Sequence, residues 1–134
     1  MCQRASEIIS DFNFLTSWEE KYEYLIGLGQ DLPKLDKKHK IDLYLIPGCQ
    51  SKVWLYCEYK NKKLYFYADS DALITKGIVA LILCFYSGSR AKDLAKEDFH
   101  LIAKTGLKKH LSMTRANGLN VMLEKIKMYG LKHV

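Results

Sequence analysis

Hydrophobic residues in the first third of the chain recur at helical spacing behind a start signal. Ser17 and Glu20 have the Ser-x-x-Glu form of a capping box, in which the Ser17 hydroxyl accepts a hydrogen bond from the Glu20 N–H and Glu20 bonds back. The apolar positions that follow at intervals of three and four are Trp18, Tyr22, Leu25 and Ile26. The pattern predicts a helix that ends before Pro33, preceded by a loosely ordered segment over residues 1–10.

After a charged linker the hydrophobic period changes to two. Alternating apolar positions predict strands over residues 41–45, 53–59 and 63–68. The first connection holds a Pro-Gly-Cys turn, and Asn61 turns the chain in the second. Because both connections are short, we expect the three strands to form an antiparallel meander.

The second half of the chain has helical patterns. Residues 72–86 are apolar nearly all round, so this helix is expected to be central and to lie on the sheet. Shorter helices are expected after Ser89 and Glu97, and a last helix is expected from Ser112. That last helix is expected to bury Leu119, Met122, Ile126 and Tyr129. The predicted fold class is α+β, an antiparallel three-stranded sheet with helices packed mainly on one face.

Length and composition fit a single domain over residues 1–134. Hydrophobic residues make up 49% and charged residues 27%, which is typical of a globular protein. The longest apolar run is far shorter than the roughly 20 residues that a membrane span needs, and the first residues are polar. We therefore expect a cytoplasmic protein without membrane association, in which the four cysteines are free thiols. Their spacing, with four scattered histidines, does not favour a metal site.

A net charge of +6 raises the prospect of an acidic partner. The lysines are spread along the chain, with short clusters only at residues 37–40 and 60–63. A nucleic-acid-binding module would need exposed aromatic rings in line with these lysines. The candidates for such rings are the tyrosines on the expected strands, Tyr44, Tyr56, Tyr65 and Tyr67, which would pack under helices equally well. A solvated basic surface explains the charge more simply.

One cysteine, Cys49, lies at a turn, directly after Pro47 and Gly48. Cys57 and Cys84 fall within an expected strand and the apolar helix, where a thiol is usually a packing residue. A tyrosine-phosphatase site needs an arginine six positions after its cysteine, and that position holds Leu55. A papain-like site needs a general-base histidine beside the thiol, and no local signature supports one. The turn position therefore favours a functional thiol at Cys49 of another kind.

The sequence around Cys49 resembles the hallmark loop of the SufE family, the sulfur-acceptor partners of cysteine desulfurases. The matching segments are Pro47-Gly48-Cys49-Gln50-Ser51-Lys52-Val53-Trp54, Asp69-Ser70-Asp71-Ala72 with Lys76-Gly77, and Leu111-Ser112-Met113-Thr114-Arg115 with Gly118. The likeness runs from about Asp11 to Tyr129, nearly the whole chain.

The resemblance implies a sulfur relay. Cys49 would accept persulfide sulfur from a pyridoxal-phosphate-dependent cysteine desulfurase of the SufS type, stimulate that enzyme and pass the sulfur to an iron–sulfur scaffold complex. The chain itself would bind no cofactor or metal. It would carry a transient persulfide on Cys49 without being an enzyme in its own right. It would be a monomer or a weak homodimer. We expect the thiol to rest against apolar neighbours until the desulfurase arrives.

Six further residues are candidates for the loop or for the partner surface. Gly48 allows backbone angles that a reaching loop needs, and Gln50 and Ser51 can hydrogen-bond across an interface or hold the turn. Asp69 and Asp71 are either caps of the helix that follows or groups that position the cysteine loop. Arg115 lies near a helix start, where the dipole favours anions, which suggests an interface or a loop anchor.

Two other functions stay open at this stage. An iron–sulfur scaffold of the U type would need three cysteines and a further ligand, so Cys57 and Cys84 would have to leave the core. A basic nucleic-acid-binding module would need the exposed aromatic rings described above.

Overall fold

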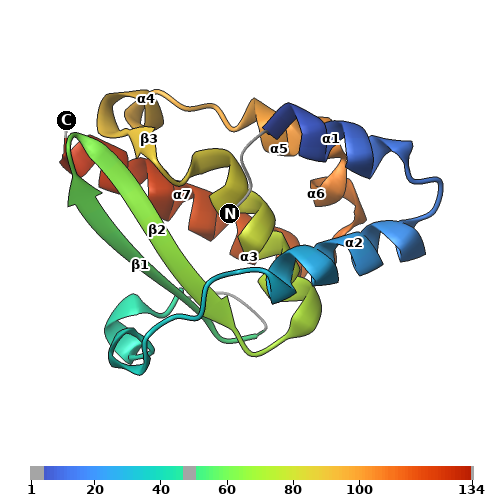
Figure 1. The fold of residues 1–134 in the computed structure, drawn as a ribbon, viewed down its shortest axis with the longest axis horizontal. Coiled ribbons are helices and arrows are strands. Elements are labelled where there is room, and N and C mark those ends of the chain that lie inside the picture. Colours follow the sequence, from blue (N-terminus) through green and yellow to red (C-terminus); the bar gives the residue numbers. More distant parts are fainter. Residues whose placement is uncertain (1–4, 47–50, 134) are drawn as a thin grey trace.

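The computed structural model describes residues 5–46 and 51–133 of the chain. It is an α+β fold in which one antiparallel sheet is packed against helices, as the hydrophobic pattern predicts (Figure 1). The α-helices are α1 (Ala5–Phe14), α2 (Trp18–Gln30), α3 (Leu73–Tyr86), α4 (Ala91–Ala95), α5 (His100–Thr105), α6 (Leu107–His110) and α7 (Met113–Lys132). Two 3-10 helices, η1 (Lys37–His39) and η2 (Asp42–Tyr44), and three strands, β1 (Val53–Lys60), β2 (Lys63–Ser70) and β3 (Ser89–Arg90), complete it.

The sheet has the strand order β1-β2-β3, but one of its strands is not the one predicted. Residues 41–45 form no strand. They contain η2, and only Leu45 bridges to Trp54. Ile41 and Leu43 are 45% and 75% exposed, so their alternation does not mark a buried face. The third strand is instead the short β3, which pairs with the start of β2.

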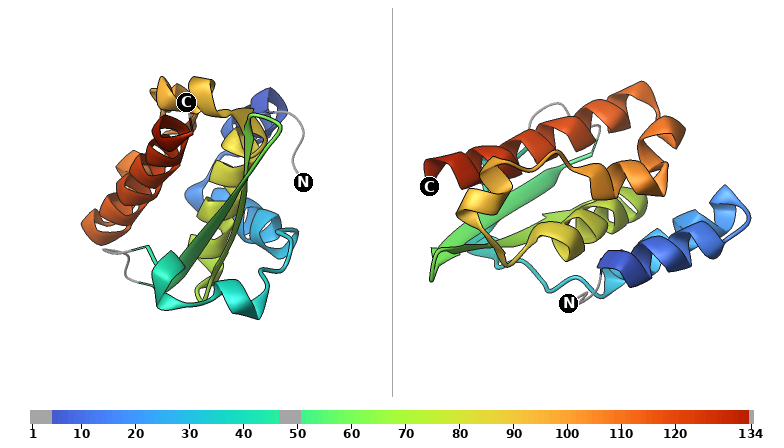
Figure 2. Two further views of the ribbon diagram at one scale, coloured as in Figure 1. Left: turned by 90° about the vertical axis from the view of Figure 1, so that its left-hand side faces the viewer. Right: turned by 90° about the horizontal axis from the view of Figure 1, so that it is seen from above.

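One face of the β1–β2 hairpin carries the core. Along β2 the buried residues of this face are Leu64, Phe66 and Ala68. Phe66 contacts Tyr129 of α7 edge-to-face, with 6.1 Å between ring centroids, and α3 also packs against β2. Figure 2 shows α3 and α7 running along the hairpin, so the helices cover mainly one face, as expected. Within α7 the predicted core residues Leu119, Met122 and Ile126 are buried, and Tyr129 is half-buried.

The opposite face of the sheet is partly covered by the segment that holds η1 and η2. His39 stacks on Tyr56 with ring centroids 3.6 Å apart, and Tyr44 meets the same ring edge-on at 5.2 Å. Two of the four tyrosines considered for nucleic-acid binding, Tyr44 and Tyr56, are therefore engaged with each other and with His39. Ring contacts, together with the Leu45–Trp54 bridge, join this segment to the sheet in place of a third long strand.

The N-terminal segment is the second difference from the sequence prediction. Residues 5–14 form α1, whereas residues 1–10 were expected to be loosely ordered. Ile8 and Phe12 are buried, and the Phe12 ring contacts Trp18 at 5.7 Å between centroids. The Phe12 ring therefore holds α1 against α2, and α1 also packs against α5.

The boundaries of the other helices follow their local signals. The capping box forms, with the Ser17 hydroxyl accepting the Glu20 N–H at 3.2 Å, and α2 ends before Pro33. Gly106 ends α5 in the left-handed conformation that glycine favours, with φ of 68°. Among the described residues, no helix is long and apolar enough to cross a membrane.

Helices α2 and α3 pack at a distance that only glycine permits. A Cβ atom at Gly77 would lie 2.2 Å from the Leu25 carbonyl oxygen, and one at Gly29 would lie 2.9 Å from the Gly77 nitrogen. Both contacts involve backbone atoms, which cannot move aside as a side chain can. This close packing holds the start of α3, and with it the end of β2, in place.

Gly77→Ala should therefore lower the free energy of unfolding by about 1–3 kcal/mol, the usual cost of forcing extra atoms into a packed interior. Gly27→Ala is the matched control, because a Cβ there meets nothing within 4 Å. That change should instead stabilise α2, by up to about 1 kcal/mol. Urea denaturation of both variants measures the difference, and equal effects would contradict the close packing.

Candidate functional site

The two ends of the cysteine loop are joined at the base by hydrogen bonds. The Ile46 N–H donates to the Val53 carbonyl at 2.8 Å, and Leu45 bridges to Trp54 in antiparallel register. The residues between Ile46 and Ser51 include three predicted site residues, Gly48, Cys49 and Gln50, which lie outside the described residues. The structure therefore defines where the loop leaves and rejoins the sheet.

Asp71 holds the downstream end of this loop. Its carboxylate accepts a hydrogen bond from the Lys52 N–H at 3.0 Å, and its own N–H donates to the Lys52 carbonyl at 3.2 Å. Asp71 does not cap the following helix, because the N-cap of α3 is Ala72, with no side-chain hydrogen bond. Of the two roles considered for Asp71, its contacts match the positioning of the loop.

Asp69 lies near the end of β2, where its side chain forms ion pairs with two lysines. The residue is only 7% exposed, and its carboxylate forms ion pairs with Lys40 and Lys76. The same carboxylate accepts the Ser70 N–H at 2.8 Å, so it does not cap α3 either. Burial alone would raise the pKa of Asp69, but the hydrogen bonds from Lys40 and Ser70 and the charges of both lysines outweigh it and hold the pKa below its ordinary value.

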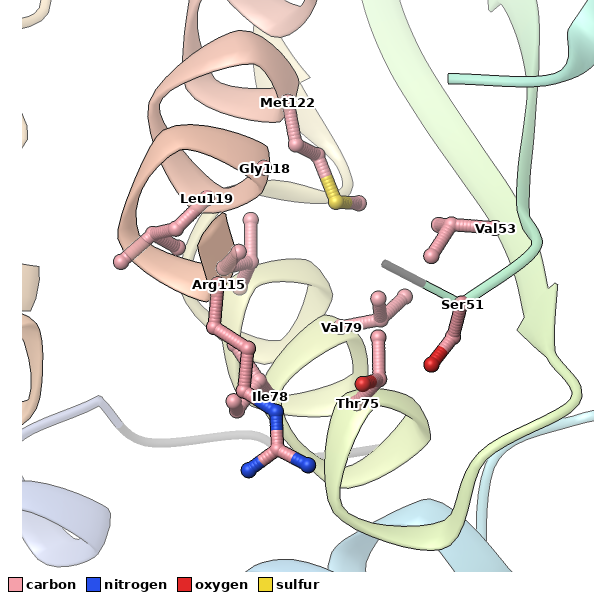
Figure 3. Close-up of a pocket in the computed structure, with 10 residues that line it drawn as sticks. Ser51, Val53, Thr75, Ile78, Val79, Arg115, Gly118, Leu119 and Met122 are labelled. Atoms are coloured by element: carbon pink, nitrogen blue, oxygen red, sulfur yellow. The ribbon is translucent and has the colours of Figure 1, made fainter. Parts of the chain in front are cut away.

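A small cavity lies between the start of β1, α3 and α7, next to the downstream end of the cysteine loop (Figure 3). Its volume is about 30 Å³. The lining residues are Ser51, Val53, Thr75, Ile78, Val79, Ile82, Arg115, Gly118, Leu119 and Met122. The structure thus brings two predicted site residues, Ser51 and Arg115, to one mostly apolar cavity, although they are far apart in sequence.

Arg115 carries a charge beside this cavity that nothing in the described part of the chain neutralises. Its backbone N–H donates to the Ser112 hydroxyl at 3.3 Å, in the first turn of α7. Its side chain makes no ion pair with any residue in 5–46 or 51–133. The guanidinium and the positive end of the α7 dipole together favour an anion at this place.

The described cysteines differ in state. Cys57 is a free, half-buried thiol whose pKa is raised to about 12, first by burial and then by the charge of Glu58. It therefore belongs to the core, as its strand position predicts. Cys84 is disulfide-bonded, which corrects the expectation that all four cysteines are free.

Sequence reasoning missed the groups that surround the predicted residues. Lys40 lies in the linker that was interpreted only as charged, and no local signal connects it with Asp69. The cavity walls on α3 and α7, such as Val79 and Met122, were assigned only to the core. Within residues 5–46 and 51–133, no group of three or more potential metal-ligating side chains was found.

Comparison with known proteins gives consistent results along nearly the whole chain. A family model described as "SufE: Fe-S metabolism associated domain" matches residues 6–130. An uncharacterized SufE-like protein of Rhizobium meliloti (strain 1021) is 40% identical over 126 residues, which cover 90% of each chain. The sulfur acceptor protein CsdE of Escherichia coli (strain K12) is 38% identical over 124 residues, covering 91% of this chain and 84% of CsdE.

Two further relatives extend the comparison. The cysteine desulfuration protein SufE of Wigglesworthia glossinidia brevipalpis is 36% identical over 121 residues, covering 89% of this chain and 84% of that protein. The solution structure of a hypothetical protein from Thermus thermophilus superimposes with a TM-score of 0.77 at 16% identity, over 96% of this chain and 94% of that one. This last likeness shows the fold.

The ionised Asp69 should make the stability of the protein depend on pH. Its lowered pKa means that its stabilising effect is present above the ordinary pKa of about 3.9 and is lost as the pH falls through the lower, folded value. Asp69→Asn should lower the free energy of unfolding by about 1–3 kcal/mol at neutral pH, because Lys40 and Lys76 lose a charged partner.

Urea denaturation at neutral and at acidic pH tests this expectation. The difference between wild type and Asp69→Asn should shrink at the acidic pH, where the carboxyl group is neutral in both states. Asp93→Asn is the control, since Asp93 is exposed on α4. A difference that stays the same at both pH values would contradict the ionic role.

Proposed function

The chain belongs to the SufE family, and on this basis we propose that it accepts sulfur on Cys49 from the persulfide of a pyridoxal-phosphate-dependent cysteine desulfurase. The observation that carries the proposal is the place of the Cys49 loop. The base of the loop is fixed by Ile46, Val53 and the Asp71–Lys52 pair. An apolar cavity adjoins its downstream end, and the cation beside this cavity, Arg115, forms no ion pair with any residue that the structure describes. This is an arrangement in which a thiol can be sheltered and still be presented to a partner.

The proposed step is a thiol–persulfide exchange. The Cys49 thiolate attacks the outer sulfur of the desulfurase persulfide, a new S–S bond forms on Cys49, and the S–S bond on the enzyme breaks. The electron pair of the broken bond leaves with the inner sulfur, which becomes the desulfurase thiolate. Sulfur moves at its own oxidation level, so the step needs no oxidant or reductant.

The cavity supports the shelter of the sulfur. Its volume of about 30 Å³ exceeds the roughly 10–15 Å³ that one water-sized group needs. Side chains such as Val53, Val79 and Met122 make most of its wall apolar. An apolar setting disfavours a thiolate and keeps oxidants and water away from a persulfide, so the resting protein would react slowly.

Arg115, at the edge of the same cavity, favours the thiolate that the apolar wall disfavours. Its guanidinium, with the α7 N-terminus, favours the anionic thiolate or persulfide once the loop brings sulfur near. The same charge is also available to a carboxylate of the desulfurase. Gly48, Gln50 and Ser51 would form the rest of the surface that meets the partner.

The sulfur would then pass to an iron–sulfur scaffold complex, in keeping with the family description as an Fe-S metabolism associated domain. Removal of the persulfide would speed the turnover of the desulfurase, so the chain would act as acceptor and activator. Pyridoxal phosphate would stay with the desulfurase, and this protein would act in the cytoplasm as a monomer or weak homodimer.

Mass spectrometry after incubation with a desulfurase, pyridoxal phosphate and cysteine tests the proposal. One additional sulfur should appear on the peptide that contains Cys49, because Cys49 lies in sequence between Ile46 and Ser51, and Ser51 lines the cavity. The signal should vanish in Cys49→Ser and persist in Cys57→Ser, whose thiol is in the core. Sulfur on another cysteine, or none in the wild type, would refute the assignment.

Arg115→Ala should slow sulfur transfer while leaving the free energy of unfolding within about 1 kcal/mol of the wild type, the usual size for a partly exposed side chain. Arg115→Lys should restore part of the rate, because it keeps the charge. Single-turnover transfer rates and urea denaturation measure the two effects separately. Parallel losses of transfer and stability would assign Arg115 a structural role.

A further inference from the structure

A second site lies at the end of the β1–β2 hairpin where the chain turns from β1 into β2. Asn61 and Lys62 make that turn with φ of 53° and 65°. The Ala91 N–H donates to the Lys62 carbonyl at 3.1 Å, which fixes the start of α4 beside the turn. The C-terminal end of α7 lies at the same end of the molecule (Figures 1 and 2).

This region is rigidly built, because α7 touches α4 through a glycine. A Cβ atom at Gly130 would lie 2.8 Å from the Ala95 nitrogen and 2.9 Å from the Ala91 carbonyl oxygen. Beyond this contact, His133 stacks on Tyr59, with ring centroids 4.3 Å apart and 11° between the planes. Backbone contacts therefore set the relative positions of the turn, β3–α4 and the end of α7.

These three elements enclose a pocket of about 640 Å³. Its lining residues are Tyr59, Asn61, Lys62, Lys63, Arg90, Ala91, Lys92 and His133. Four of them carry a fixed positive charge, and no carboxylate lines the pocket. Asp93, which follows Lys92, is not part of the lining.

The cations also stand opposite one another across the sheet. Lys63 of β2 pairs with Lys60 of β1 on one side and with Arg90 of β3 on the other. Like charges in directly opposite positions destabilise a sheet. None of these three side chains forms an ion pair within residues 5–46 and 51–133, so nothing described there offsets the repulsion. Like charges that face one another across a sheet at a cost in stability are expected at functional sites.

From this geometry we propose that the pocket binds a small ligand that carries two or more phosphate groups. The lining offers ammonium and guanidinium donors, and phosphate oxygens accept several such hydrogen bonds at once. A volume of about 640 Å³ lies within the 300–1,000 Å³ range of small-molecule sites.

This site is separate from the proposed sulfur chemistry. None of its lining residues lines the cavity beside the cysteine loop. The cysteine loop joins β1 at Val53, whereas the pocket lies at the other end of the same strand, beside Tyr59. A test of this pocket is therefore independent of the role of Cys49.

Calorimetric titration with tripolyphosphate tests the proposal on three proteins: the wild type, Lys63→Gln/Arg90→Gln, and Lys37→Gln/Lys38→Gln. The last is a matched control, because it removes the same charge from the other lysine cluster, on η1. The wild type and the control should bind equally well, whereas the Lys63/Arg90 variant should lose at least tenfold in affinity. Equal affinity in all three proteins would show a general attraction to charge and overturn the proposal.

Thermal melts without ligand separate a binding role from a structural one. Since the double substitution removes a repulsion, its unliganded melting temperature should equal or exceed that of the wild type. A clear decrease would assign Lys63 and Arg90 to the fold instead. If the variant does not fold, amide chemical shifts of the wild type decide: tripolyphosphate should move resonances of residues 59–63 and 90–92, and shifts confined to other regions would refute the site.

A titration with polyglutamate and one with single-stranded RNA complete the test. Both should bind more weakly than tripolyphosphate, because a compact pocket favours a small, dense anion. Tighter binding of polyglutamate would identify an acidic peptide as the partner, and tighter binding of RNA would identify a nucleic-acid surface. Either result would overturn the proposal of a small phosphate ligand.

Discussion

The hydrogen bonds at the base of the cysteine loop are the constraint on which the proposed chemistry depends. Ile46 is bonded to Val53, and Lys52 is bonded twice to Asp71, so both ends of the loop are tied to the sheet. Asp71 in turn lies between the end of β2 and the start of α3. The positions of the two ends of the loop are therefore set by the hairpin and by the helix that follows it.

Packing beneath the loop follows from the same arrangement. Gly77 lets α2 approach α3 closely, and Asp69 ties the end of β2 to Lys76 in the first turns of α3. Helix α7 covers the same face of the sheet, so a cavity remains between α3, α7 and Val53. The cavity is apolar between α3 and α7, and it has a positive charge at Arg115, in the first turn of α7. This arrangement suits a thiol that must be protected at rest and anionic when it reacts.

Features that depend on neighbouring residues were predictable from the sequence. The capping box of α2, the hairpin turn and the apolar α3 each have a local signal that agrees with the fold. The resemblance of residues 47–54 to a known loop also predicts a site in the segment whose two ends are anchored beside the cavity.

Features that depend on distant partners were not predictable. Ile41 and Leu43 alternate like strand residues, yet they are exposed because no neighbouring strand pairs with them. Residues 1–10 were expected to be loosely ordered, yet residues 5–10 belong to α1. The burial of Phe12 in this helix depends on the rings of Trp18 and Tyr24 in α2, which no local pattern reveals. Asp69 and Asp71 looked like helix caps, but their partners include lysines 29 and 19 positions away in the chain, which no local pattern reveals.

The alkylation rate of Cys49 tests the central claim most directly, since the claim is that the anchored loop shelters this thiol. Iodoacetamide labelling followed by mass spectrometry should show slow modification of Cys49 in the free protein, compared with a peptide of residues 45–54. The rate should rise when a desulfurase is added, and it should rise in Asp71→Ala but not in Asp93→Ala, because only Asp71 holds Lys52. A free-protein rate equal to that of the peptide, unchanged by Asp71→Ala, would contradict the account.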